Sequence, residues 1–270
     1  EKIVPFMAVI YIIGTLIIFF MNINRVPDVF GAIFKSAFGF DAVAGGISGA
    51  LIKEAMTMGL KRGIFSNEAG LGSSVMVHSA SDVKEPVVQG MWGIFEVFFD
   101  TFVVCTLTAF SILSTGIIDL ETGAVQGSLE GTQLVTEAFS RSIHGAAGFF
   151  VAISTLFFAF STVLGWSFYG TKSMEYLFGE KIAMVYKVIF VLFTIVGATM
   201  KLDLAWEITD TLNGLMAVPN LFGVLLLSGV VVRVTRNYVK RVIKKTEPDA
   251  EPMLSAYPEI QTEQAEKLKA

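Results

Sequence analysis

The chain has 270 residues, of which 53% are hydrophobic and 16% are charged, and its mean hydropathy is +0.65. Ordinary soluble domains contain about 25% charged residues, so the composition argues against an aqueous globular domain. A net charge of −4, with the basic residues concentrated after Arg233, also argues against a nucleic-acid-binding protein.

Apolar runs long enough to cross a bilayer begin at the start of the chain, since a hydrocarbon core of roughly 30 Å needs about 20 helical residues. Residues 3–21 contain no charged side chain, which predicts a first membrane span. The run begins without an initiator Met or a signal-peptide pattern, so we expect the natural amino-terminal part to be missing. Residues 22–40 mix charged and aromatic side chains, which is typical of an amphipathic connector at the interface.

The next region, residues 41–80, is too interrupted by glycines and charged residues for one regular helix. We expect it to form a discontinuous membrane segment. A clearer span is predicted over residues 87–113, directly after Pro86. The polar stretch 114–144 predicts an external loop with a short helix near 132–142.

Three more apolar runs follow, at residues 145–168, 184–200 and 215–232. A charged turn separates the first two, and a mixed stretch over 202–213 precedes the last. With the earlier segments, these runs predict an all-α integral membrane protein with about six transmembrane segments.

Basic residues crowd just beyond the last apolar run, at Arg233, Arg236, Lys240, Arg241, Lys244 and Lys245. Because basic residues favour the cytoplasmic side, we expect a multi-pass protein of the cell membrane with a cytoplasmic carboxyl terminus. The polar sequence that follows predicts a transmembrane domain over 1–236 and a disordered cytoplasmic tail over 237–270.

The most unusual polar sequence within the membrane segments is residues 59–73, which read GLKRGIFSNEAGLGS. Its glycines permit an unwound backbone, whose free N–H and C=O groups can coordinate a zwitterion and a small cation. Side-chain oxygens of Ser66, Asn67, Glu68 and Ser73 can add to such a site. The alternative is a loop in water in which the charged side chains are simply solvated.

A second polar group lies in the 145–168 run. Thr162 and Trp166 are four residues apart and share a helix face, so they can form a hydroxyl and a ring wall of one pocket. Ser161 beside Thr162 offers a second hydroxyl oxygen to Na⁺. The alternative is that these hydroxyls hydrogen-bond to carbonyl groups of their own or neighbouring helices.

Two carboxylates, Glu96 and Asp100, share one face of the 87–113 helix. They indicate either an ion pathway or structural pairing with Lys53, Lys61 or Arg62. The sequence holds no phosphate-binding glycine loop followed by Lys-Ser/Thr, no zinc-ligand spacing and no nucleophile elbow. We therefore expect neither an enzyme, with catalytic residues and a cofactor, nor an ATP-driven pump.

The 59–73 sequence and its continuation, GLKRGIFSNEAGLGSSVMVHSA, resemble the alanine or glycine:cation symporter family, as do EPVVQG at 85–90 and FDTFVVCTLTA at 99–109. The resemblance implies symport of alanine or glycine with Na⁺, or with H⁺, by alternating access. It also implies the second half of a leucine-transporter-like inverted-repeat fold, with residues 41–80 as the discontinuous helix and the first half of the same protein as partner.

The resemblance further implies roles for the polar residues. Ser66, Asn67, Glu68 and Gly70 would lie near the substrate, with Thr162 and Trp166 on a scaffold helix facing it and Ser161 or Thr162 near the coupling Na⁺. A passive channel is the alternative, although polarity is confined to a few mid-span points. A non-transporting membrane subunit with a lipid-binding basic tail is a further alternative.

Overall fold

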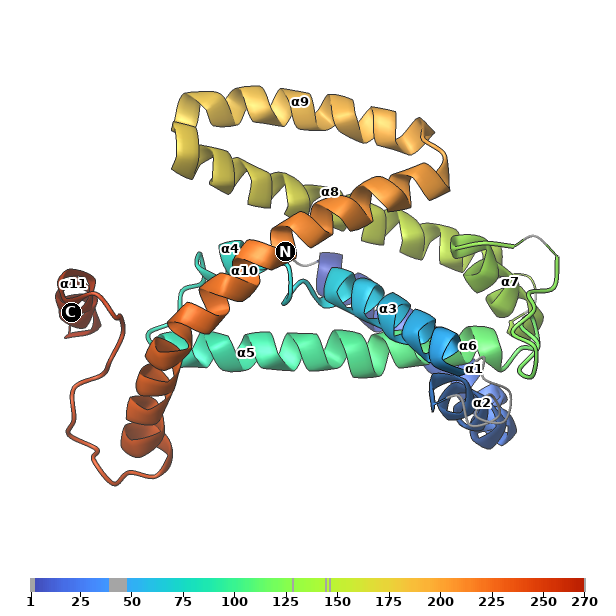
Figure 1. Cartoon of the computed structure of the whole chain (residues 1–270), viewed down its shortest axis with the longest axis horizontal. Helices are drawn as coiled ribbons and strands as arrows, with labels where there is room; N and C mark the ends of the chain where they lie inside the picture. Colours follow the sequence, from blue (N-terminus) through green and yellow to red (C-terminus); the bar gives the residue numbers. More distant parts are fainter. Residues whose placement is uncertain (1–2, 39–47, 128, 144, 146, 270) are drawn as a thin grey trace. The chain divides into compact units, whose positions relative to one another are not determined.

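The computed structural model describes residues 3–38, 48–127, 129–143, 145 and 147–269, and these residues are mainly helical (Figure 1). Within this part of the chain, five helices are long and apolar enough to cross a membrane. The prediction of an all-helical membrane protein is thus confirmed. The sixth predicted segment, over 41–80, does not form such a helix, and its first residues, 41–47, lie outside the described residues.

The chain divides into two compact units. Unit 1 contains Glu1–Gly63 and Phe99–Ala198, and unit 2 contains Ile64–Phe98 and Thr199–Ala270.

Unit 1 begins with α1 (Ile3–Met21), which has the bounds of the first predicted span. A single 3₁₀ turn (Ile23–Arg25) leads into α2 (Val26–Phe38), where the sequence predicts an amphipathic connector. Asp28 lies in the first turn of α2, where a negative charge is favoured by the helix dipole, and Val29 is its buried residue.

The predicted 87–113 span is a continuous helical run in three parts: α5 (Pro86–Phe98), a π-helical stretch (Phe99–Val104) and α6 (Cys105–Leu113). The short helix predicted in the following loop is α7 (Thr132–Ser142). In that loop the Asp119 carboxylate accepts hydrogen bonds from the N–H and hydroxyl of Thr122 and from the N–H of Glu121, which lower its pKa.

The helices α8 (Ala147–Phe178) and α9 (Glu180–Thr199) form an antiparallel pair joined by a tight turn (Figure 1). Gly179 makes the turn with a φ of 82°, which a glycine adopts without steric cost. The sequence predicts a helix end near residue 168, but α8 continues ten residues further, to Phe178, and Lys172 and Glu175 pair on its surface at 2.8 Å.

The core of unit 1 is a cluster of apolar side chains between α1, α7 and α8. Ile18, Phe139, Ala147 and Val151 are all buried. Met7, Val29, Phe110 and Ile117 are buried as well, but many other large apolar side chains of the unit are exposed. In the most apolar 18-residue stretch of α9, only 6% of the residues are buried. This inverted distribution suits helices whose solvent is lipid.

Unit 2 contains the last turn of α3 (Ser48–Asn67), the short α4 (Val75–His78) and α5. It also contains α10 (Leu202–Tyr238), which merges the predicted mixed stretch and last span into one helix. A π-helical turn (Val239–Ile243) and α11 (Pro258–Lys269) follow where composition favours disorder.

Candidate functional site

The break between α3 and α4 interrupts the helical backbone of unit 2. Helix α3 ends at Asn67, and Glu68 adopts a φ of 56°, which non-glycine residues rarely do. The carbonyl of Glu68 accepts hydrogen bonds from the N–H groups of Leu71 and Gly72, both at 3.0 Å. Gly72 then has a φ of 74°, so the chain reverses its handedness twice within five residues.

Side chains of the predicted site hold this break together. The Ser73 hydroxyl donates to the Glu68 carboxylate at 2.8 Å, and Ser73 is only 1% exposed. The Asn67 side-chain oxygen accepts from the N–H of Ala69 at 3.2 Å, a local turn typical of Asn. Asn67, Glu68 and Ser73 therefore shape the break, which the sequence predicts only as a ligand-coordinating segment.

Asn220 of α10 is not among the predicted site residues, yet it contacts the break. Its side-chain amide donates to the carbonyl oxygens of Ala69 at 3.2 Å and Gly70 at 3.0 Å. These are backbone acceptors that the break removes from helical hydrogen bonding. Asn220 follows Pro219 inside an apolar stretch of α10. A polar amide next to a proline within a membrane span is the sequence signal that could have identified Asn220 as a site residue.

Asn220 also explains why residue 72 is a glycine. A Cβ atom built on Gly72 would lie 2.6 Å from the Cγ atom of Asn220. It would lie even closer to the side-chain oxygen of Asn220. A Cβ at Gly70 would lie 2.7 Å from Cγ2 of Ile64. Both glycines therefore permit a close approach of the broken backbone to neighbouring side chains.

A second contact joins the end of α3 to α10. The rings of Phe65 and Trp206 meet edge to face with centroids 5.6 Å apart. Trp206 and Asn220 are separated by about 21 Å along α10. The last turn of α3 and the break after it are thus fixed at two points on the same helix.

The predicted residues of α8 lie in the other unit. The Ser161 hydroxyl donates to the carbonyl of Phe158 at 3.0 Å. The alternative prediction, a hydroxyl that hydrogen-bonds within its own helix, therefore holds for Ser161. Trp166 packs edge to face on Tyr169, with ring centroids 5.6 Å apart. Thr162 and Trp166 belong to unit 1 and the break belongs to unit 2, and their approach to each other stays a prediction.

The carboxylates Glu96 and Asp100 lie in α5 and in the π-helical stretch after it. Glu96 lies 3.3 Å from Nε2 of His78, and the Gln89 amide lies 2.6 Å from Nδ1 of the same ring. His78 therefore bridges two residues of α5 to α4. Single π-turns occur often at functional sites, which keeps the ion pathway through Asp100 as a prediction.

The fold and the interrupted helix define the class: a multi-pass helical membrane protein in which distant side chains hold a helix break. The model of the sodium:alanine symporter family matches residues 1–252, and the chain belongs to that family. This is a family of amino-acid transporters, so the chain is not an enzyme.

Three relatives illustrate the similarity. The chain is 47% identical over 236 residues to the sodium/alanine symporter AgcS of Methanococcus maripaludis, covering 87% of the chain and 50% of the relative. It is 36% identical over 242 residues to two Bacillus subtilis proteins, the amino-acid carrier protein AlsT and the probable sodium/glutamine symporter GlnT. These alignments cover 89% of the chain and 50% and 48% of the relatives.

The chain thus spans about half the length of the curated relatives that it matches. No solved structure matches the chain.

Proposed function

We propose that the full-length protein carries a small neutral amino acid, alanine or glycine, across the cell membrane together with Na⁺ or H⁺ by alternating access. Family membership supports symport, and the archaeal relative is named a sodium/alanine symporter. The chain would be the second half of a leucine-transporter-like inverted repeat, completed by the amino-terminal half of the same protein.

The observation that carries this proposal is the helix break of unit 2. The carboxyl end of α3 has the negative end of its helix dipole, and the Glu68 carboxylate lies beside it. A small cation or an ammonium group is favoured in such a place, particularly away from bulk water. In our proposal Ser66, Asn67, Glu68 and Gly70 line the substrate site.

The other half of the site would come from α8. We propose that Thr162 and Trp166 form its opposite wall, that Ser161 and Thr162 supply oxygens to Na⁺, and that Glu96 and Asp100 belong to an ion pathway. The proposal requires no cofactor beyond the coupling ion, Na⁺ or H⁺. The basic residues after Arg233 would place the carboxyl terminus in the cytoplasm.

Uptake by the full-length protein in proteoliposomes tests the proposal. Labelled alanine or glycine should accumulate only with an inward Na⁺ or H⁺ gradient, and labelled glutamine measures the breadth of the site. Uptake that persists after choline replaces Na⁺ and the proton gradient is dissipated would exclude coupled transport. Single-channel conductance in a planar bilayer would favour a channel instead.

The same assay tests the site. Asn67→Ala and Thr162→Ala each remove a polar group, so the apparent affinity for substrate should fall about tenfold if these groups contact substrate or ion. Thr171→Ala is a suitable control because this hydroxyl donates within α8 to the Ser167 carbonyl at 2.7 Å. Wild-type affinity in both site variants would show that the pocket lies elsewhere.

A further inference from the structure

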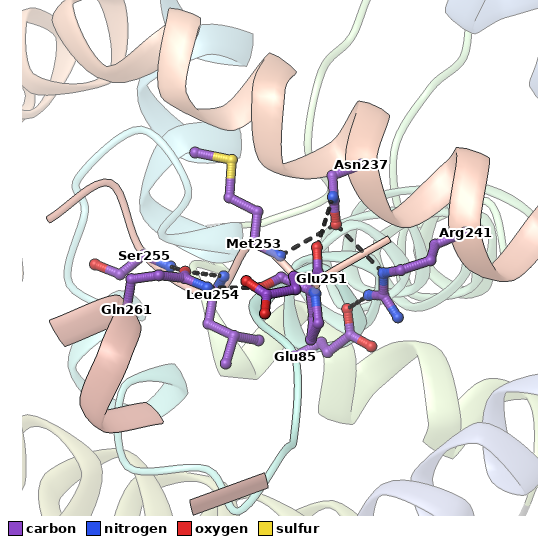
Figure 2. Close-up of polar contacts among 9 residues, drawn as sticks. Glu85, Asn237, Arg241, Glu251, Met253, Leu254, Ser255 and Gln261 are labelled. Carbon is purple, nitrogen blue, oxygen red and sulfur yellow. Dashed lines mark hydrogen bonds and ion pairs between the residues drawn. The ribbon is translucent and has the colours of Figure 1, made fainter. Parts of the chain in front are cut away.

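The carboxyl-terminal tail covers one flank of the end of α10 (Figure 2). The Asn237 amide donates to the carbonyl of Glu251 at 3.0 Å, and its oxygen accepts from the N–H of Met253 at 3.1 Å. Four residues further on, Arg241 pairs with Glu85, which directly precedes α5, and its Nε lies 3.4 Å from the Asn237 oxygen. Asn237 and Arg241 therefore mark the flank that faces the tail and the start of α5.

One side chain of α11 orders this tail. Gln261 donates to the carbonyl of Pro252 at 2.6 Å, and its oxygen accepts from the N–H groups of Leu254 and Ser255 at 2.6 and 2.9 Å (Figure 2). These three hydrogen bonds lie within the tail and order the segment that Asn237 holds.

The basic residues at the end of α10 fall into two groups. Lys240 pairs with Glu247 of the tail at 2.6 Å, and Arg241 is paired as described above. Arg233 and Arg236 are exposed, and neither guanidinium has an ion-pair or hydrogen-bonding partner among the residues that the structure describes. Two positive charges are thus left, at the end of the apolar part of α10, for a ligand from outside the described chain.

These two arginines continue an exposed apolar face of α10. Residues three, four or seven positions from Gly229 lie on the same side of the helix as Gly229. By this spacing, one strip of the helix surface contains Phe222, Leu225, Leu226, Gly229, Arg233 and Arg236. The first three side chains are 65%, 62% and 81% exposed, and a Cβ atom on Gly229 would meet nothing within 4 Å. The strip is therefore an open surface that is apolar at one end and cationic at the other.

The dimensions of this strip match one leaflet of a bilayer. Phe222 and Arg233 are about 17 Å apart along the helix axis, close to half of a hydrocarbon core of roughly 30 Å. A phospholipid carries its phosphate at the end of acyl chains of this length, and guanidinium groups bind phosphate oxygens strongly. A headgroup that also carries an ammonium group is repelled by the arginines, so an anionic headgroup fits better.

We propose that this strip binds one anionic phospholipid, with its phosphate between Arg233 and Arg236 and an acyl chain along Gly229, Leu225 and Phe222. Each of the two charges should raise the affinity for the lipid about fivefold. The charges of Lys240 and Arg241 take no part because they are paired within unit 2. This site goes beyond the proposed function and does not rest on it.

Native mass spectrometry of the full-length protein in detergent micelles tests the site. Palmitoyl-oleoyl-phosphatidylglycerol should bind more tightly than the phosphatidylcholine with the same acyl chains. Arg233→Gln with Arg236→Gln should lower the affinity for phosphatidylglycerol roughly tenfold to thirtyfold. Equal affinities of the wild-type protein for the two lipids would overturn the proposal and favour a protein contact on the strip.

A matched pair of charges separates a site from diffuse attraction. Lys244 and Lys245 follow the π-helical turn and are exposed, and in the described part of the chain their ammonium groups likewise have no partner. Lys244→Gln with Lys245→Gln removes the same charge but should lower the affinity less than about threefold, because these charges lie beyond the strip. Equal losses in the two double variants would contradict a site at the arginines.

Thermal unfolding is the control for the arginine variant. The structure describes no partner of either guanidinium, so Arg233→Gln with Arg236→Gln should unfold at the wild-type temperature in the absence of added lipid. A clearly lower unfolding temperature would show that the arginines contact protein and would contradict the proposal.

The wild-type protein tests the apolar part of the strip without any substitution. Dihexanoyl-phosphatidylglycerol has the same headgroup on shorter chains and should bind at least about tenfold more weakly than the long-chain lipid. An excess of glycerol 1-phosphate should not displace the long-chain lipid. Displacement by glycerol 1-phosphate, or equal binding of the two chain lengths, would show a site for the phosphate group alone and contradict the phospholipid site.

Discussion

Two interruptions of apolar helices, at Gly179 and at residues 68–74, are made in opposite ways. The turn at Gly179 is local: its N–H donates to the Glu175 carbonyl at 2.9 Å, and a glycine supplies the positive φ. The break after α3 places Glu68 at a positive φ, and Asn220 holds its carbonyls from 150 residues away in sequence. Only the second interruption depends on tertiary structure.

The difference shows which interruption can respond to movement elsewhere. A non-glycine residue at positive φ costs about 1–3 kcal/mol and persists only where its surroundings enforce that conformation. At Glu68 the enforcing contacts come from Ser73 and, through the adjacent carbonyls, from Asn220. A shift of α10 would therefore change the break, whereas the Gly179 turn would remain.

The largest expected effect is at Gly72. Gly72→Ala adds a Cβ atom at a φ of 74° and within 2.6 Å of Asn220 Cγ, so we expect about 2–4 kcal/mol of destabilisation and loss of uptake. Thermal unfolding and uptake of the full-length protein measure both. Gly63→Ala in helical α3, where nothing lies within 4 Å, should be neutral or stabilising. Equal effects of the two substitutions would refute a tertiary origin of the break.

Asn220→Ala should have the next largest effect. It leaves the Ala69 and Gly70 carbonyls without their side-chain donor, at a cost of about 2 kcal/mol, and should lower uptake about tenfold. Asn220→Asp keeps the shape but cannot donate when ionised, so it should behave similarly. Asn213→Ala, about two turns earlier in α10, is the matched control. Full activity of both Asn220 variants would mean that the break is stable without this clamp.

The smallest effect belongs to the local hairpin. A Cβ at Gly170 of α8 would lie 2.8 Å from Cε1 of Tyr186 in α9 and closer to its hydroxyl, so Gly170→Ala should cost about 1 kcal/mol of thermal stability. Uptake by the folded fraction should be retained. Gly165→Ala, with open space around it, is the control, and Tyr186→Phe should partly rescue Gly170→Ala. Strong loss of uptake by correctly folded Gly170→Ala would contradict the claim that transport depends on the break after α3 and not on the α8–α9 hairpin.

Much of the fold follows from the sequence because lipid imposes long, uncharged helices. The residue 3–21 span, the 87–113 run and the short helix at 132–142 were predictable from hydropathy and turn composition. The end of α8 was not, because charged residues that pair on a helix surface resemble a turn in composition. Within the predicted segment 41–80, α3 is a regular helix, but its four charged residues make it too polar to count as a membrane span, and the backbone break follows its end.

The candidate site was predictable only in part. The motif around Ser66–Gly70 locates the break because unusual glycines and polar residues within apolar sequence are a local signal. Asn220 carries a local signal beside Pro219, but its main-chain partners 150 residues away were not predictable, and neither were those of Asn237 in a polar loop. Nor does composition reveal that Gln261 orders the tail, because its effect arises from three specific hydrogen bonds.

The length of α10 has a mechanical consequence. Its 37 residues extend about 56 Å, which is nearly twice the thickness of a hydrocarbon core. A small bend in the middle of so long a helix therefore moves its ends by a large distance. Pro219 lies next to Asn220, and Asn237 lies about 27 Å from Pro219 along the helix axis. A bend of about 5° at the proline would move that distal end by about 2 Å, enough to stretch the contacts around Arg241 beyond hydrogen-bonding range.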